Sequence, residues 1–249
     1  MNPSLEGKTA LVTGGSSGIG RAIAIDLARH GAHVILSGRD VKRGEDVVAG
    51  IRSGSRTADF VAATLAGEQS ARELARCAVE LCGGHVDILV NNAGVFPFGP
   101  THATTEAELD AVYDINVKVP FFLVAELAPA MAERGKGAII NIGSMVAYYG
   151  QAQMALYGSS KAALMLLTKA WAAEYGPAGV RVNAVSPGPT RTEGTAPMGS
   201  ALDDLASTIP HGRPATPEEI APAVTFLASD EASFIHGAVL PVDGGRIAV

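Results

Sequence analysis

A tyrosine and a lysine four residues apart, Tyr157 and Lys161, are the side chains whose types and spacing point most directly to chemistry. On a helix this spacing places both side chains on one face. The ordinary pKa of tyrosine is about 10, and a nearby positive charge lowers it by favouring the phenolate. A tyrosine tuned in this way exchanges a proton with a substrate oxygen near neutral pH. The alternative interpretation is a solvated lysine that covers a tyrosine ring.

A glycine-rich turn near the N-terminus indicates phosphate binding. The apolar run 9–12 is typical of a strand, and apolar residues recur every four positions over 19–27, a helical period. Gly14, Gly18 and Gly20 lie at their junction, where glycine lets a phosphate approach the free N–H groups of the helix. The spacing differs from the G-x-G-x-x-G pattern. A tight connection is the alternative, but the strand before and the helix after favour a dinucleotide site.

The end of the next apolar run, 33–37, indicates which dinucleotide binds. At this point an acidic residue binds the ribose 2′-hydroxyl of NAD, whereas an arginine accommodates the 2′-phosphate of NADP. The chain has Gly38 and Arg39 there, and Ser37 can add a neutral hydrogen bond. We therefore predict that NADP(H) is preferred, with NAD(H) as a second cofactor. The alternative is a solvated Arg39 paired with Asp40.

Short apolar runs alternate with helical stretches along the whole chain. The candidate strands lie near 8–13, 33–38, 58–63, 86–91, 137–143, 180–186 and 238–241. This alternation predicts an α/β fold: a Rossmann-type doubly wound parallel sheet of about seven strands, with helices on both faces, in a single domain covering 1–249. The irregular segment 188–214 is rich in proline and glycine, and we expect it to form a lid over the substrate.

The chain resembles the compact, single-domain branch of the short-chain dehydrogenase/reductase family, which includes reductases of carrier-bound 3-oxoacyl chains. The resemblance runs from about Lys8 to Gly245, and the motifs that carry it are Thr13–Gly20, Asn91–Gly94, Asn116, Ser144, Tyr157, Lys161 and Pro187–Gly188, in that order. It implies that Asn116, Ser144, Tyr157 and Lys161 are the catalytic residues. Ser144 would fix the substrate oxygen near Tyr157, and Lys161 would also bind the nicotinamide ribose.

The resemblance also implies the residues that contact the cofactor. They are Gly14, Ser16, Ser17, Gly18, Ile19, Gly20, Ser37, Arg39, Thr64, Leu65, Asn92, Ala93, Gly94, Tyr157, Lys161, Pro187, Gly188, Thr190 and Thr192. Thr64 stands where the family usually places an aspartate that binds the adenine amino group, and a threonine can accept a hydrogen bond there but brings no charge.

Pro120 lies four residues after Asn116 and has no N–H to give to the Asn116 carbonyl. The resemblance implies that this carbonyl holds a water that links Asn116 to Lys161 in a proton relay. The alternative is that Pro120 only kinks a helix.

Apolar and aromatic residues dominate the predicted substrate pocket. Its predicted members are Phe96, Met145, Tyr149, Gln151 and Met154, and further candidates are Val95, Phe98, Val146 and Tyr148. They favour a ketone or secondary alcohol with an apolar body. Carrier-bound 3-oxoacyl chains are the alternative substrate: Ala178 stands where such reductases tend to carry a basic residue, although Arg134 and Lys136 could offer a basic edge. A non-catalytic binding protein of the same fold is disfavoured by the presence of both Tyr157 and Lys161.

Composition limits the partners. The net charge of −6 argues against nucleic acid or an anionic membrane. No apolar run approaches the roughly eighteen residues of a membrane span, and we expect a cytoplasmic protein. The histidines show no metal-ligand spacing, so we predict no catalytic metal. The apolar segment 234–249 is expected at the edge of the sheet, where pairing between subunits would give a homotetramer.

Overall fold

The computed structural model describes residues 4–249 and contains one seven-stranded parallel sheet in the order β3-β2-β1-β4-β5-β6-β7. The strands are β1 (Thr9–Val12), β2 (His33–Gly38), β3 (Ala58–Ala62), β4 (Ile88–Asn91), β5 (Gly137–Ile142), β6 (Val180–Pro187) and β7 (Val239–Val242). Each lies where the alternation of apolar runs predicts a strand. The predicted doubly wound α/β fold is therefore confirmed.

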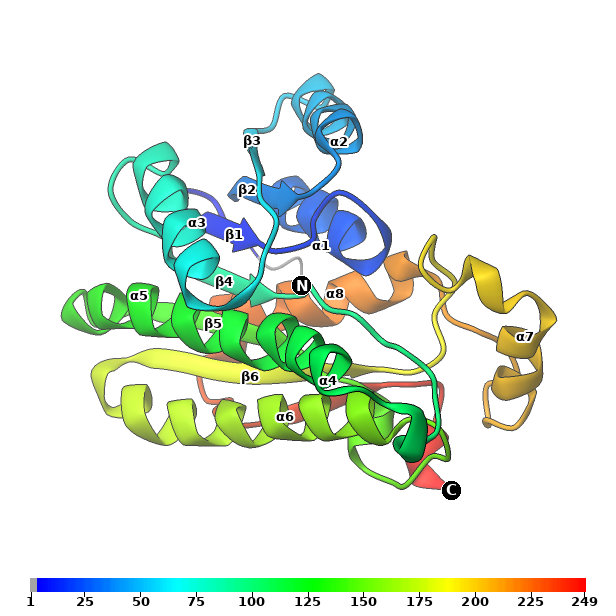
Figure 1. The fold of residues 1–249 in the computed structure, drawn as a ribbon. Helices are drawn as coiled ribbons and strands as arrows, with labels where there is room; N and C mark the ends of the chain where they lie inside the picture. The colour runs from blue at the N-terminus through cyan, green and yellow to red at the C-terminus, as the bar shows by residue number, and fades with distance from the viewer. Residues whose placement is uncertain (1–3) are drawn as a thin grey trace.

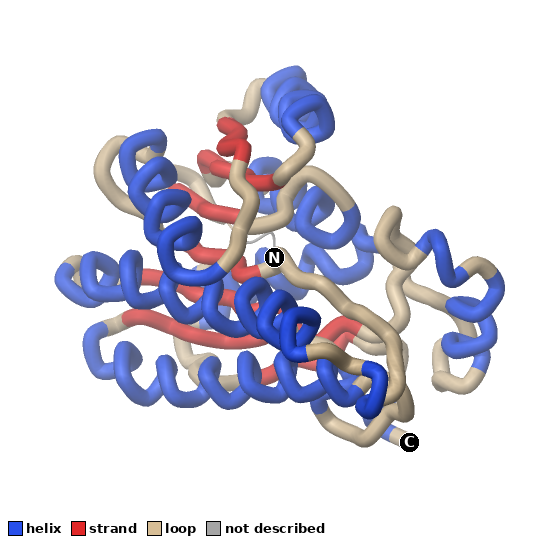
Figure 2. Tube along the Cα trace, viewed as in Figure 1, coloured by secondary structure: helices blue, strands red, loops and turns tan. Residues whose placement is uncertain are grey.

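Helices cover both faces of the sheet (Figures 1 and 2). The α-helices within residues 4–249 are α1 (Gly18–Arg29), α2 (Val41–Ser53), α3 (Gly67–Leu81), α4 (Glu106–Tyr113), α5 (Val119–Glu133), α6 (Ala155–Tyr175), α7 (Ser200–Ser207) and α8 (Pro217–Ala228). Buried side chains of α1, α2 and α8 form one apolar core with the sheet, and those of α3, α5 and α6 form another. This two-sided burial explains why the strands are almost uniformly apolar.

The strand order reverses between β1 and β4, and a ligand site is expected at this point. β1 pairs with β2 on one side and with β4 on the other, all in parallel. Open α/β sheets bind their ligands outside the carboxyl ends of the strands at such a reversal. Here the Thr13 hydroxyl accepts hydrogen bonds from the N–H groups of Asn92 and Ala93, both at 3.0 Å, and so fixes the glycine-rich turn against the segment that follows β4.

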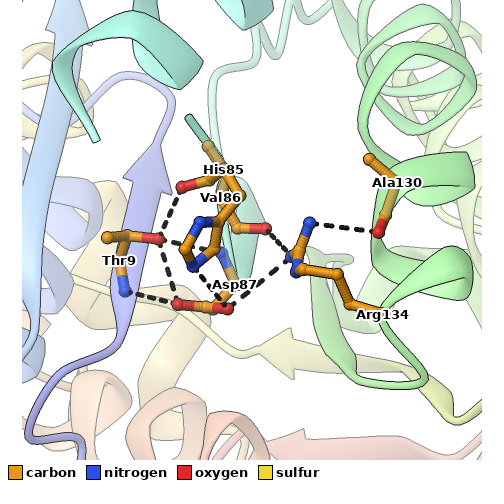
Figure 3. Close-up of polar contacts among 6 residues, drawn as sticks. All are labelled: Thr9, His85, Val86, Asp87, Ala130 and Arg134. Carbon is orange, nitrogen blue, oxygen red and sulfur yellow. Dashed lines mark hydrogen bonds and ion pairs between the residues drawn. The ribbon is translucent and has the colours of Figure 1, made fainter. Parts of the chain in front are cut away.

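A polar cluster fastens the opposite end of the sheet (Figure 3). The Thr9 N–H donates to the Asp87 carboxylate at 3.0 Å, which ties the start of β1 to the start of β4. Arg134 follows α5 and donates to the Val86 carbonyl at 2.9 Å, with its guanidinium 3.6 Å from Asp87. The proposed basic edge at Arg134 therefore lies at the amino ends of the strands, because a helix between parallel strands returns the chain to that end. Its charge is also engaged, which disfavours it as a carrier-docking site.

One helical stretch is an exception to the expectation that no segment approaches the length of a membrane span. The stretch Glu106–Glu133 is long and apolar enough by length and composition. Within it Leu123, Leu127 and Met131 are buried in the core that α5 forms with the sheet. Its apolar composition is explained by this packing.

The segment after β6 stands apart from the sheet. Figure 1 shows α7 beyond the carboxyl ends of the strands, on a long excursion that returns at α8. Thr216 and Glu219 form a capping box at the start of α8, with Pro217 in the first turn. The segment after β6 therefore ends at a well-capped helix. It lies beyond the carboxyl ends of the strands, where ligands are expected.

Candidate active site

Tyr157 and Lys161 lie in the first two turns of α6, on one face, beside the end of β5. The Lys161 ammonium is 5.9 Å from the centroid of the Tyr157 ring, and it donates to the Ile142 carbonyl at 2.8 Å. Ser144 comes two residues after β5, and its side chain hydrogen-bonds the Tyr157 phenol. The structure therefore brings together three of the four residues predicted to be catalytic.

Burial dominates the protonation of this group. It lowers the pKa of Lys161 to about 8, because a buried ammonium loses its hydration. Burial also raises the pKa of Tyr157, and the hydrogen bond with Ser144 acts in the opposite direction. The expectation that Lys161 lowers the pKa of Tyr157 below its ordinary value is therefore wrong for this geometry. The lysine points to a carbonyl oxygen, and loss of solvent around the phenol has the larger effect.

Asn116, the fourth predicted catalytic residue, is fully buried in a widened helical turn between α4 and α5. The Val119 N–H donates to the Asp114 carbonyl, five residues earlier, which is the spacing of a π-helix. The Asn116 amide accepts from the Val95 N–H at 2.9 Å and donates to the Ser160 hydroxyl at 3.0 Å. Asn116 therefore joins the segment after β4 to α6, directly beside Lys161.

Gly94 marks the point where these elements meet. A Cβ atom at this position would lie 3.1 Å from the Asn116 side-chain oxygen and 3.4 Å from the Lys161 ammonium. A side chain here would push the amide and the ammonium aside. The glycine of the Asn91–Gly94 motif thus leaves room for both polar groups.

The glycine-rich turn has a shape that only glycine provides. Gly14 and Gly18 have φ values of +65° and +51°, which residues other than glycine rarely adopt. A Cβ atom on Gly20 would lie 2.3 Å from the Gly14 carbonyl oxygen. The turn therefore closes tightly on the first residues of α1 and leaves their backbone open to a ligand.

An acidic side chain from the segment after β6 occupies this helix start. The Glu193 carboxylate accepts from the Gly18 N–H at 2.9 Å and lies 3.4 Å from the Arg21 guanidinium. It stands in for the anion that the free N–H groups and the positive end of the helix dipole attract. The turn thus fits a phosphate group of a dinucleotide. No pattern in the sequence pointed to Glu193, since 175 residues separate it from Gly18.

Arg39 is exposed at the end of β2 and is not paired with Asp40. Asp40 instead caps α2: its carboxylate accepts from the Arg43 N–H at 3.0 Å and binds the Arg43 guanidinium at 2.7 Å. The alternative interpretation, an ion pair between Arg39 and Asp40, is therefore wrong. The neighbouring Ser37 hydroxyl is buried and has no hydrogen-bond partner within residues 4–249. An arginine and an unsatisfied hydroxyl at this position suit a ribose that carries a 2′-phosphate.

The Ser16 hydroxyl lies against Gly38, because a Cβ atom there would be 2.5 Å from the Ser16 side-chain oxygen. Thr192 packs on the same turn, since a Cβ atom on Gly18 would lie 3.2 Å from the Thr192 methyl group. Thr190 is buried, and its carbonyl accepts from the Thr195 hydroxyl at 2.9 Å.

Three further predicted cofactor residues differ in their surroundings. Thr64 is exposed just after β3, whereas Leu65 packs against the apolar core beneath it. A Cβ atom at Gly188 would lie 2.6 Å from the Asp243 backbone, so the ends of β6 and β7 approach closely there. Within residues 4–249 no three His, Cys, Asp or Glu side chains are grouped to hold a metal ion.

The predicted pocket residues form a small apolar cluster beside Tyr157. We call it the pocket cluster; its buried members are Met145, Val146 and Met154, and the residues packed against them are Tyr149, Tyr157, Leu205 and Ile247. Leu205 comes from α7, within the segment predicted to be the lid, and Ile247 comes from the C-terminal segment. Sequence reasoning named neither residue as a pocket member.

Phe96 lies on another side of Tyr157. Its ring meets the Tyr157 ring edge-on, with 6.2 Å between the centroids. A Cβ atom on Gly194 would lie 3.2 Å from the tip of Phe96, so the segment after β6 reaches this ring. Gln151, by contrast, is exposed and lies outside the pocket cluster.

Comparison with known proteins agrees with this architecture. The family model described as "Enoyl-(Acyl carrier protein) reductase" matches residues 14–246. A solved structure described as a short chain dehydrogenase/reductase family protein is 48% identical, covers 100% of both chains and has a TM-score of 0.91. The chain therefore belongs to the short-chain dehydrogenase/reductase family, whose members are oxidoreductases of CH–OH and C=O groups.

Two further relatives show how the family varies. A structure from Beutenbergia cavernae, provisionally described as an NAD(P)-dependent gluconate 5-dehydrogenase with bound NADP, is 40% identical, covers 99% of each chain and has a TM-score of 0.93. A cyclopentanol dehydrogenase from Comamonas sp. is 39% identical over 246 residues, 97% of each chain.

Proposed function

We propose that this protein is an NADP(H)-dependent oxidoreductase that interconverts a small ketone and its secondary alcohol. The observation that carries the proposal is the meeting of Ser144, Tyr157 and Lys161 in a fold whose glycine-rich turn offers the Gly18 N–H to a carboxylate. The test is oxidation of NADPH by the purified protein with a panel of ketones and 3-oxoacyl thioesters. A protein that oxidises NADPH with none of them would instead be a binding protein of the same fold.

In the proposed mechanism the hydroxyls of Ser144 and Tyr157 hold the substrate oxygen. Tyr157 gives its proton to that oxygen during reduction and takes one from it during oxidation. Lys161, with a pKa of about 8, exchanges protons near neutral pH and can resupply the phenol. Asn116 joins the segment after β4 to α6 and so holds both elements in place around Lys161. Bound nicotinamide supplies or accepts the hydride.

The cofactor would lie across the carboxyl ends of β1, β2 and β4. The turn from Gly14 to Gly20 would take its phosphates, and Arg39 would take the 2′-phosphate of NADP. The NADP bound in the Beutenbergia cavernae structure supports this cofactor for a relative of the same fold.

The substrate is proposed to be a free ketone or alcohol and not a carrier-bound chain. Relatives of similar sequence identity have names that point to a charged alcohol in one case and to a neutral alcohol in the other. Similarity to these relatives therefore does not decide whether the substrate is charged. The matching family model favours carrier-bound acyl chains. The engaged Arg134 at the far end of the sheet and the absence of a basic residue at Ala178 support a free substrate.

The segment 188–214 is proposed to be the substrate lid, and Glu193 gives a way to test its coupling to the cofactor. We expect Glu193→Gln to tighten NADPH binding several-fold, because it removes a negative charge that competes with the cofactor phosphates for the Gly18 N–H and Arg21. Fluorescence titration of NADPH measures the Kd.

Glu231 is exposed in the short turn after α8, away from the glycine-rich turn, so Glu231→Gln is the matched control for loss of one acidic charge. Weaker NADPH binding by Glu193→Gln would contradict the prediction and show that the carboxylate supports the occupied site.

A homotetramer is proposed as the assembled form. β7 lies at the edge of the sheet and is only partly buried, and Phe234 just before it is fully exposed. Pairing with another subunit would cover this apolar edge. We expect light scattering at micromolar concentration to give about four times the 25.4 kDa mass of one chain. A stable monomer would contradict this proposal.

A further inference from the structure

We propose that Arg246 makes the substrate pocket selective for ketones and alcohols that carry a carboxylate group. The inference rests on the proposed function, because it assumes that the substrate lies in the pocket cluster beside Tyr157. It adds the charge of the substrate, which neither the motifs nor the relatives decide.

Arg246 contacts the pocket cluster through Tyr149. It follows β7 in the C-terminal segment, and its Nε donates to the Tyr149 hydroxyl at 3.1 Å. Its guanidinium carbon is 4.9 Å from the centroid of the Tyr149 ring. Tyr149 and Ile247, the next residue in the chain, both pack against the buried residues that also support Tyr157. The guanidinium is therefore anchored to the wall that lines the proposed substrate site.

The charge of Arg246 has no carboxylate partner within residues 4–249. Its one other hydrogen bond, to the Thr208 hydroxyl, is long at 3.5 Å. Asp243 is near in sequence, but its two carboxylate oxygens accept from the N–H groups of Gly245 and Ile247, at 2.9 and 3.0 Å. Asp243 thus holds the turn that presents Arg246 and does not neutralise it.

Arginines of the segment after β6 show the contrast. Arg191 pairs with Asp203 and Arg213 pairs with Glu219, each at 2.6 Å. A half-buried guanidinium without such a partner retains unused donors, and a planar carboxylate matches them in two parallel hydrogen bonds. The apolar members of the pocket cluster offer no competing charge. A substrate with one carboxylate would supply the missing partner, whereas a neutral substrate would leave the charge unpaired.

The test compares 4-oxocyclohexanecarboxylate with its carboxamide, which has the same ring and carbonyl but no charge. We expect the unmodified enzyme with NADPH to favour the carboxylate in kcat/KM. Arg246→Met should lower kcat/KM for the carboxylate about tenfold or more and leave the carboxamide within about twofold, as loss of one charge-assisted contact predicts. Arg246→Lys should retain part of the preference. Arg29→Met, at an exposed arginine on α1, is the control.

Equal losses for both compounds in Arg246→Met, or no preference in the unmodified enzyme, would overturn the inference. If no ketone is reduced, the proposed function fails, and calorimetric titration of both compounds into the NADPH-loaded protein decides the inference separately. Tighter binding of the carboxylate that is lost in Arg246→Met supports it. Equal binding of the two compounds, or no binding of the carboxylate, overturns it.

Discussion

Replacing Tyr157 with phenylalanine is expected to lower kcat by at least about a hundredfold, the usual contribution of a general acid–base group. The change removes only the hydroxyl that Ser144 hydrogen-bonds, and it keeps the ring that packs against Phe96 and the pocket cluster. The fold and NADPH binding should therefore persist. Steady-state turnover with the best ketone of the panel measures the effect.

Thermal unfolding and NADPH titration serve as the controls for this variant. Lys161→Ala is a useful companion, because we expect it to raise the cofactor KM as well as lower kcat, through loss of the proposed ribose contact. Comparable turnover by Tyr157→Phe and the unmodified enzyme would mean that another group is the acid.

Replacing Arg39 with alanine is expected to lower kcat/KM for NADPH by about ten- to a hundredfold. A charge-assisted hydrogen bond to phosphate contributes about 1.5–3 kcal/mol, and about 1.4 kcal/mol corresponds to tenfold. NADH has no phosphate at that position and should be nearly unaffected. The measurement is kcat/KM for both cofactors with one fixed ketone.

Arg43→Ala is the matched control, because Arg43 lies nearby but is paired with Asp40. Equal use of NADH and NADPH by the unmodified enzyme would contradict the prediction. A Gly38→Asp variant would place a ribose acceptor and a repelling charge at this position and would be expected to shift preference towards NADH. The structure makes that variant less suitable, since its Cβ atom would lie 2.5 Å from the Ser16 hydroxyl and would disturb the turn that both cofactors share.

The sequence by itself determined the sheet and most of the candidate catalytic group. Each strand is a local apolar run, so its position follows from neighbouring residues alone. Tyr157 and Lys161 share a helix face because they are four residues apart. A parallel sheet then places the ends of its strands along one edge, and this brings Ser144 beside Tyr157. Local pattern and one topological rule were therefore enough for these residues.

Only the tertiary structure decided the contacts between residues far apart in the chain. Glu193 meets Gly18, and Ile247 and Leu205 meet the pocket cluster, through a lid and a terminal segment whose paths no periodic pattern encodes. It also reversed the expected pKa shift of Tyr157, because the shift depends on how much water the surrounding elements exclude. Spacing along the chain fixes which side chains share a face. Burial and long-range partners depend on how separate elements pack. The contact between Arg246 and Tyr149, on which the proposed substrate charge rests, is a result of this packing.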